Sequence, residues 1–263
     1  MPQDSVVFDR AADFYDETRG FPPGEEKAIG KLIAEAGGLT PSSRVLEIGV
    51  GTGRIALPVS AYVKQYIGAD LSRPMMDRLR AKRTVEPIQL VLSDATRLPI
   101  ADNAFDAAVV VHVFHLIPGY LEVVKELERV LKPDARLIVG RNQRASRSDV
   151  FKPMIDVWEG VIPSEKQKHV GVQEDEEDTF LATLGWQPIE PRRQYPFTIR
   201  VSPRQYFESH QRRIWSSNWR LNDEEHAHAV EEVRRVMEAT YPDPDQLFEI
   251  ETGFNVDVYL PPN

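Results

Sequence analysis

Three glycines occur at every second position in a short turn after an apolar stretch. Gly49, Gly51 and Gly53 directly follow Arg44–Ile48, which has the composition of a buried strand. Glycine allows a tight turn and the close approach of a ligand, and the amino end of a following helix offers free N–H groups to a negative group. The turn therefore predicts a site for a nucleotide-like cofactor. Arg54 stands where the dinucleotide pattern G-x-G-x-x-G has its third glycine, and the Gly-Lys-Ser/Thr of a phosphate loop is missing.

Three carboxylates stand near the ends of successive predicted strands. Glu47 precedes the glycine turn. Asp70 comes 23 positions after Glu47, and Asp94 comes 24 positions after Asp70. In doubly wound nucleotide-binding folds an acid at the end of the second strand accepts hydrogen bonds from ribose hydroxyls, and this is the position of Asp70. Asp94 would lie beside the adenine. A single acid at a strand end usually caps a helix, but three acids beside the glycine turn indicate a nucleoside site.

Helix and strand patterns alternate along the sequence up to about residue 140, and these elements must position the glycines and the carboxylates. The apolar runs predict strands over 44–48, 65–70, 88–92, 105–112 and 136–140, with helices that include 23–36 and 120–131. This alternation is typical of a parallel sheet with helices on both faces, an α/β doubly wound fold.

The pattern is less regular after residue 140. Helices are predicted over 151–161, 175–184, 203–215 and 223–240, and strands over 186–200 and 247–260. We therefore expect a single domain, 1–263, in which 1–145 form the cofactor-binding core and 246–260 the last strand. Insertions at roughly 146–175 and 200–245 are expected to form a helical cap over the acceptor site.

Residues 45–140 resemble a class I S-adenosylmethionine-dependent methyltransferase of the small-molecule type that includes the ubiquinone and menaquinone biosynthesis methyltransferases. The matching motifs are Glu47-Ile-Gly-Val-Gly-Thr-Gly53, Asp70-Leu-Ser, Ser93-Asp-Ala95, the stretch from Leu98 to Asp106, and Glu128-Arg-Val-Leu-Lys-Pro133. The resemblance implies a Rossmann-like seven-stranded sheet, S-adenosylmethionine as cofactor and S-adenosylhomocysteine as product. Asp134-Ala135 departs from the two glycines usual in the family, which alters a turn between helix and strand.

The resemblance also implies which residues contact the cofactor. The glycine turn would lie against the methionine part, Asp70 would hold the ribose, and Asp94 with Ala95 would reach the adenine. Tyr15 and Arg19 would help close over the cofactor, although a plain amphipathic start of the chain explains these two equally well. The expected cofactor-binding residues are Tyr15, Arg19, Glu47, Gly49, Gly51, Gly53, Asp70, Leu71, Asp94, Ala95 and Val111.

Two histidines follow the fourth predicted strand, beside the point where a doubly wound sheet places its substrate. Methyl transfer requires an acceptor held in line with the methyl group and, for some acceptors, a base that removes a proton. Imidazole titrates near neutral pH, so we assign the catalytic role to His112. The family often has a histidine near the position of His115 that packs against the cofactor. His115 and Arg141 are expected on the substrate side, where Arg141 and Asn142 would face the acceptor, although a loop arginine is more often solvated.

The stretch 192–220 carries seven arginines against Glu208 alone, a local net charge of +6, with six aromatic residues interleaved. Such a segment could form a pocket for an anionic or aromatic small molecule, or a stacking and phosphate surface for single-stranded RNA. It could also be a cap whose aromatic side chains form its own core and whose arginines face water. Of the two ligand hypotheses we favour the small molecule, because the stretch is short and acidic segments surround it.

The composition narrows the class of protein. The net charge of −9 argues against duplex DNA or long RNA as a partner, because that binding neutralises phosphates. The chain has no cysteine, which excludes disulfides and thiolate chemistry, and we expect no metal site. No run approaches the length of a membrane span, so we expect a cytoplasmic protein.

The most direct interpretation is methyl transfer to a small-molecule acceptor. An RNA or protein methyltransferase of the same fold is the first alternative. From other classes, a nicotinamide-dependent oxidoreductase is disfavoured by the glycine spacing, and a non-catalytic cofactor-binding sensor stays open. The sequence indicates neither the acceptor atom nor an oligomeric state.

Overall fold

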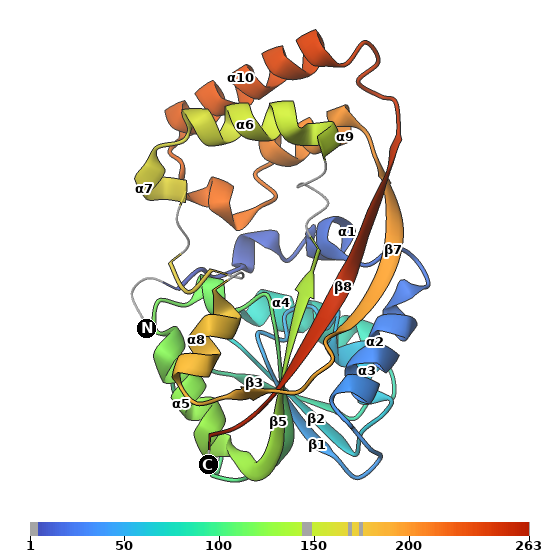
Figure 1. Cartoon of the computed structure of the whole chain (residues 1–263), viewed down its shortest axis with the longest axis vertical. Helices are drawn as coiled ribbons and strands as arrows, with labels where there is room; N and C mark the ends of the chain where they lie inside the picture. Colours follow the sequence, from blue (N-terminus) through green and yellow to red (C-terminus); the bar gives the residue numbers. More distant parts are fainter. Residues whose placement is uncertain (1–4, 144–148, 168–169, 174–175, 263) are drawn as a thin grey trace. The chain divides into compact units, whose positions relative to one another are not determined.

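The computed structural model describes residues 5–143, 149–167, 170–173 and 176–262 and contains one mixed sheet. Its strand order is β3-β2-β1-β4-β5-β8-β6, and β7 pairs with β8 off this path (Figure 1). The strands are β1 Arg44–Ile48, β2 Gln65–Asp70, β3 Ile88–Leu92, β4 Phe105–Val111, β5 Leu131–Asn142, β6 Gln187–Pro188, β7 Arg193–Val201 and β8 Phe248–Leu260. Strands β1 to β5 pair in parallel, whereas β6 is antiparallel to β8. The path of seven strands confirms the predicted doubly wound fold, and β7 adds an eighth strand.

Side-chain caps mark the starts of three of the described helices. The helices are α1 Tyr15–Arg19, α2 Glu25–Ala36, α3 Ala56–Ser60, α4 Arg73–Lys82, α5 Tyr120–Val130, α6 Lys152–Val161, α7 Ser164–Gln167, α8 Glu177–Thr183, α9 Pro203–Gln211 and α10 Asp223–Thr240. Ser72 caps α4, and Ser202 and Asn222 form capping boxes with the third residues of α9 and α10.

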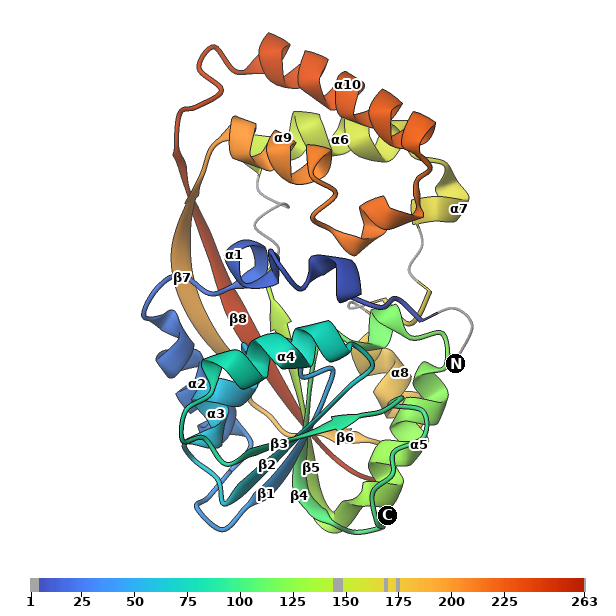
Figure 2. The ribbon, with the colours of Figure 1, turned by 180° about the vertical axis from the view of Figure 1, so that it is seen from behind.

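Different helices pack against the two opposite faces of the sheet (Figure 2). Side chains of Leu46, Ala108 and Leu137 pack with α5 and α8 in one apolar cluster. The neighbouring strand positions point the other way, and the end of α2 lies against Ile138 on that second face. Successive side chains of a strand alternate between faces, and the helices on both sides bury the β4 run almost completely.

The chain divides into two compact units. The first unit comprises 1–141, 170–195 and 254–263, and the second comprises 142–169 and 196–253. The second unit has its own apolar core, built by α6, α9 and α10 around side chains that include Phe151, Tyr206 and Val233. The predicted cap ranges 146–175 and 200–245 fall mainly in the second unit, but residues 170–173 belong to the first. The expected cap over the acceptor site stays a prediction.

Two predicted elements differ from the structure. The helix expected over 203–215 ends at Gln211, because the chain turns at Arg213, which has a left-handed φ of +51°, and Ile214 N–H donates back to Ser209 O. The strand expected over 186–200 is split into β6 and β7, since Pro188 and Pro191 offer no N–H group to a ladder. No helix of the described ranges combines the length and apolar character needed to cross a bilayer.

Candidate functional site

The sheet register brings the predicted site residues to one edge. Ile48 of β1 is level with Ala69 of β2 and with Val110 of β4, and Val111 is level with Gly140 of β5. The segments that follow these strands therefore leave the sheet at its carboxyl edge. This edge is where open α/β sheets bind ligands.

The glycine turn requires glycine for both conformation and space. Gly49 and Gly53 have φ of +73° and +84°, in the left-handed region that disfavours side chains. A Cβ at Gly49 would come within 2.5 Å of the Val113 side chain, and one at Gly53 within 2.2 Å of Leu79. A Cβ at Gly51 would meet nothing closer than 3.4 Å. At Gly51 the left-handed φ of +52°, rather than lack of space, is what favours glycine.

Two backbone N–H groups fix the carboxylate of Asp70. Gly51 N donates to Oδ2 and Ser72 N donates to Oδ1, each over 2.7 Å. Burial raises the pKa of Asp70, and the hydrogen bonds from Ser72 and Gly51 oppose that rise. Each carboxylate oxygen has further lone pairs. Asp70 is therefore held in one orientation and can still accept hydrogen bonds from a ligand.

Asp94 lies at the end of the neighbouring strand, as the sequence predicts. Ser93 N donates to the carbonyl oxygen of Asp70 over 2.9 Å, which ties the two strand ends together. Thr96 N donates to Asp94 Oδ1 over 2.9 Å and holds that carboxylate in a local turn. Ala95 is buried beside them with 6% exposure. The structure thus brings the predicted ribose and adenine residues together.

Glu47 is a buried carboxyl group under the glycine turn. The Tyr66 hydroxyl donates to its Oε2 over 2.8 Å, and both side chains are buried. Burial raises the pKa of Glu47 to about 8, although the Tyr66 hydrogen bond and the charge of Arg54 lower it. Burial therefore favours the protonated form of Glu47.

The N-terminal segment, residues 5–21, contacts the glycine turn and the start of α4. Asp16 accepts a hydrogen bond from Thr52 Oγ1 over 2.5 Å, and Asp9 accepts one from Ser72 Oγ over 2.6 Å. Arg54 donates to the carbonyl oxygen of Arg19 over 2.9 Å and its guanidinium lies 4.6 Å from the centre of the Phe21 ring. The predicted contact of this segment with the cofactor, through Tyr15 and Arg19, stays a prediction.

The backbone of His112 has an unusual conformation immediately after β4. Its φ of +57° is left-handed, which is uncommon for a residue other than glycine and often marks a functional site. The ring of His115 is only 9% exposed and lies edge-on to the His112 ring, with 6.5 Å between the ring centres. Both histidines lie at the predicted edge, and their catalytic and substrate roles stay predictions.

Arg141 is engaged by acidic side chains. Its guanidinium forms ion pairs with Glu177 (2.7 Å), Asp178 (2.8 Å) and Asp257 (2.6 Å), and its side chain is 12% exposed. Burial lowers the pKa of Arg141, but the attraction and hydrogen bond of Glu177 and the attraction of Asp257 together outweigh burial and raise the pKa. The predicted recognition of an acceptor by Arg141 would need this cluster to open, so the geometry favours a structural role.

Four of the arginines in the stretch 192–220, Arg192, Arg200, Arg204 and Arg213, form ion pairs with acidic side chains. Ion pairs join Arg200 to Glu249 (2.6 Å) and Arg204 to Asp245 (2.6 Å). The aromatic side chains Tyr206, Phe207 and Trp215 pack in the core of the second unit. This arrangement agrees with the interpretation of a cap that has its own core.

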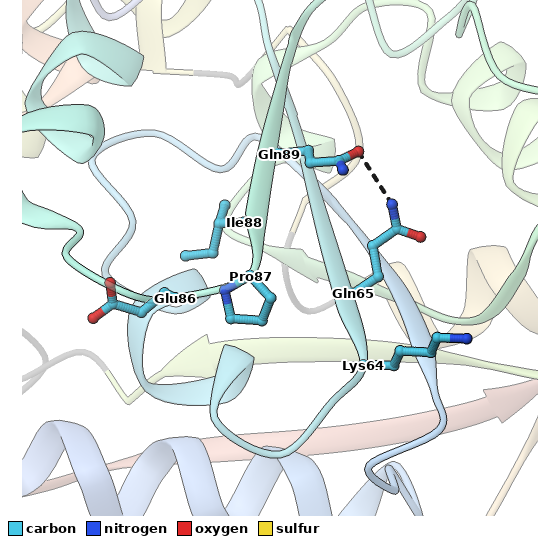
Figure 3. Close-up of a pocket in the computed structure, with 6 residues that line it drawn as sticks. All are labelled: Lys64, Gln65, Glu86, Pro87, Ile88 and Gln89. Carbon is cyan, nitrogen blue, oxygen red and sulfur yellow. Dashed lines mark hydrogen bonds between the residues drawn. The ribbon is translucent and has the colours of Figure 1, made fainter.

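A shallow pocket of about 430 Å³ lies away from this edge (Figure 3). Lys64 and Gln65 at the start of β2, and residues 86–89 at the start of β3, line it. Gln65 donates to Gln89 across it over 3.1 Å. The amino ends of the strands form this pocket, so it is separate from the glycine turn and its carboxylates.

Sequence reasoning missed the residues that support the site. Ser72 precedes Arg73-Pro74, a recognisable helix-start signal. Nothing in the sequence marks Asp9 or Asp16 as partners of hydroxyls near the glycine turn, because the hydrogen bonds join residues 63 and 36 positions apart.

Comparison with known proteins agrees with this geometry. Residues 46–139 match the methyltransferase domain family. The demethylmenaquinone methyltransferase of Renibacterium salmoninarum is 31% identical over 136 residues, which cover 51% of this chain and 56% of that protein. The chain thus spans about half the length of the curated relatives it matches.

Solved structures share the fold. A phosphoethanolamine N-methyltransferase of Haemonchus contortus in complex with S-adenosylhomocysteine superposes with a TM-score of 0.53 and 18% identity, covering 97% of this chain and 58% of that one. The [4+2]-cyclase SpnF superposes with a TM-score of 0.55 and 22% identity, covering 90% and 80%. The family match over residues 46–139 agrees with the resemblance that the sequence motifs indicate, and the solved structures show that the fold is shared.

Proposed function

We propose that the protein transfers a methyl group from S-adenosylmethionine to a small-molecule acceptor. The observation that carries the proposal is the Asp70 carboxylate, held at the glycine turn by the N–H groups of Gly51 and Ser72. The match of residues 46–139 to the methyltransferase domain supports it. The name of the Renibacterium salmoninarum relative, a quinone-pathway enzyme, supports a small acceptor.

The residues of this edge fit the parts of S-adenosylmethionine. The glycine turn would lie against the methionine part, with Glu47 buried beneath it, and Asp70 would accept hydrogen bonds from the ribose hydroxyls. Asp94 and Ala95 would border the adenine. The remaining expected contacts are Leu71, Val111, Tyr15 and Arg19. The cofactor supplies a methyl group on a positively charged sulfur, whose departure as a neutral thioether makes the transfer favourable.

The chain's own contribution to transfer is to orient the acceptor and to accept a proton. His112 follows β4 at the same edge, with a backbone conformation that sets the direction of its side chain. Its imidazole would take the acceptor's proton as the methyl group arrives, a role worth about 10²-fold or more in rate. His115, buried beside it, would line the acceptor side.

The likeness to a [4+2]-cyclase favours a second candidate function. The same fold can hold a cofactor-type site while catalysing a different reaction, because fold and function are separable. A protein that binds S-adenosylmethionine without transferring its methyl group is therefore the alternative.

Calorimetry with S-adenosylmethionine, S-adenosylhomocysteine and NADH tests the cofactor. We expect micromolar binding of the first two and none of NADH, and preferential binding of NADH would refute the proposal. Asp70→Ala should weaken S-adenosylhomocysteine binding about tenfold or more, because ribose hydroxyls lose a charged acceptor. Asp102→Ala, at an exposed position on another loop, is the matched control.

An acceptor screen that detects S-adenosylhomocysteine tests the transfer. Formation of this product only in the presence of an acceptor supports methyl transfer. Tight cofactor binding with no product across quinols, phenols, amines and thiols would favour the second candidate.

A further inference from the structure

Two buried hydroxyl groups flank the proposed cofactor carboxylate, and both donate to the N-terminal segment. Ser72 and Thr52 are each 1% exposed. Ser72 Oγ donates to Asp9 Oδ1 over 2.6 Å, and Thr52 Oγ1 donates to Asp16 Oδ1 over 2.5 Å. A buried hydroxyl that loses its acceptor carries a desolvation cost, so these contacts constrain the residues on both sides.

Ser72 connects Asp9 to Asp70. The backbone N–H of Ser72 donates to Asp70 Oδ1 over 2.7 Å, and its Oγ accepts from Met75 N over 3.2 Å as the cap of α4. Because the single hydroxyl proton is directed to Asp9, the lone pairs of Oγ face Met75. Asp9 therefore selects the rotamer in which the Ser72 side chain caps α4, and this cap holds the backbone whose N–H group donates to Asp70.

Asp16 acts on the other side of the same carboxylate. Its second oxygen, Oδ2, accepts from Lys82 Nζ over 2.7 Å, at the end of α4, while Oδ1 holds Thr52. Thr52 directly follows Gly51, whose N–H donates to Asp70 Oδ2. The N–H groups of Ser72 and Gly51 thus orient Asp70. The hydroxyls of Ser72 itself and of Thr52, next to Gly51, donate to the N-terminal segment.

We infer that Asp9 is a positioning residue for the cofactor site, which acts through the Ser72 hydroxyl to preset Asp70, with Asp16 and Thr52 as the parallel contact on the glycine turn. The inference rests on the proposed function, because Asp70 is there assigned to the ribose. Cofactor affinity is then coupled to a segment more than 60 positions earlier in the chain, because Asp9 acts on Asp70 through Ser72.

The test compares Asp9→Ala, Asp9→Asn, Ser72→Ala and the double variant Asp9→Ala/Ser72→Ala. Calorimetry with S-adenosylhomocysteine should show about tenfold weaker binding for Asp9→Ala and for Ser72→Ala. The double variant should bind no more weakly than either single one, because both remove the same hydrogen bond. Asp9→Asn keeps an acceptor oxygen and should retain affinity within about twofold.

Asp13→Ala is the matched control. Asp13 lies on the same segment and pairs with Arg78 of α4 at an exposed position, with no contact to Ser72. We expect its affinity to equal that of the wild type. Equal losses in Asp13→Ala and Asp9→Ala would overturn the inference, since they would indicate general loosening of the segment. Additive losses from Asp9 and Ser72, or an equal loss in Asp9→Asn, would also overturn it.

Hydrogen exchange of the ligand-free protein separates this inference from the proposed function. Peptides that contain the amides of Gly51 and Ser72 should exchange about tenfold faster in Asp9→Ala than in the wild type or in Asp13→Ala. Unchanged exchange would overturn the positioning role even if S-adenosylhomocysteine binds. Faster exchange in a protein that binds no S-adenosylhomocysteine would instead contradict the proposed function alone.

Discussion

The buried carboxyl of Glu47 predicts an unusual dependence of stability on pH. Its pKa is about 8 in the folded protein, against 4.5 when exposed, chiefly because burial disfavours the charged form. The folded state therefore keeps a proton that the unfolded state releases above about pH 4.5, so stability falls as the pH rises through the interval from about 4.5 to about 8.

The size of the effect follows from the two pKa values. One pKa unit corresponds to about 1.4 kcal/mol, so the first unit should lose roughly 3 kcal/mol of stability between about pH 5 and about pH 8. Glu47→Gln is neutral at every pH and keeps an acceptor oxygen for Tyr66. This variant should lose the slope and exceed the wild type in stability by about 3 kcal/mol near pH 8.

Urea unfolding across this pH range, followed by circular dichroism and by hydrogen exchange of β1, measures the slope. Glu35→Gln is the matched control, because Glu35 is an exposed carboxylate of the same unit, 3.6 Å from Lys31, and should leave the pH profile unchanged. Parallel profiles for the wild type and Glu47→Gln would show that Glu47 is ionised in the folded protein and would refute the reasoning.

Three further predictions concern other groups. Arg141→Met should destabilise the first unit by about 3 kcal/mol in urea unfolding, because it removes the guanidinium that pairs with the buried carboxylates of Glu177 and Asp257, while Asp257 keeps its ion pair with Arg192. His210 is buried, and desolvation lowers its pKa to about 3, so the second unit should lose about 2 kcal/mol between pH 7 and pH 5 as the unfolded imidazole gains a proton. His112→Asn should reduce turnover of an identified acceptor about 10²-fold or more with unchanged cofactor binding, since Asn tolerates a left-handed φ but is no base.

Controls for these three predictions use nearby groups. Arg200→Met breaks an exposed ion pair with Glu249 and should have little effect on stability, unlike Arg141→Met. In His210→Phe the loss of stability between pH 7 and pH 5 should be smaller by about 2 kcal/mol. An unchanged loss would assign the effect to another group, such as His226, whose pKa burial also lowers. Unchanged turnover in His112→Asn would remove His112 from the mechanism.

The strands and the edge they form could be predicted from sequence because both depend on local patterns. Val109 and its neighbours form an uninterrupted apolar run, and such a run in a parallel sheet is buried on both faces. The glycine turn followed from steric rules alone, and the left-handed φ of Gly49 and Gly53 agrees with them.

The partners of charged groups could not be predicted in the same way. Arg141 lies next to the predicted edge, but its partners Glu177 and Asp257 follow 36 and 116 positions later. A count of charges along the sequence gives 192–220 a net charge of +6. In the structure, Arg200 and Arg204 of this stretch pair with carboxylates 49 and 41 positions later in the chain. Which charged groups form ion pairs depends on the residues that are close in the folded structure, and a count over one segment of the sequence does not include those residues.

Each of the two units is built from separate segments of the chain, and this limits how early either unit can fold during synthesis. The chain passes between the units four times, after residues 141, 169, 195 and 253. Ile250 completes the core of the second unit, and β8 joins β5 to β6 in the first. Neither unit can complete its packing until the last strand has left the ribosome. A premature stop before residue 248 would remove a strand that both units need and would therefore disable both at once.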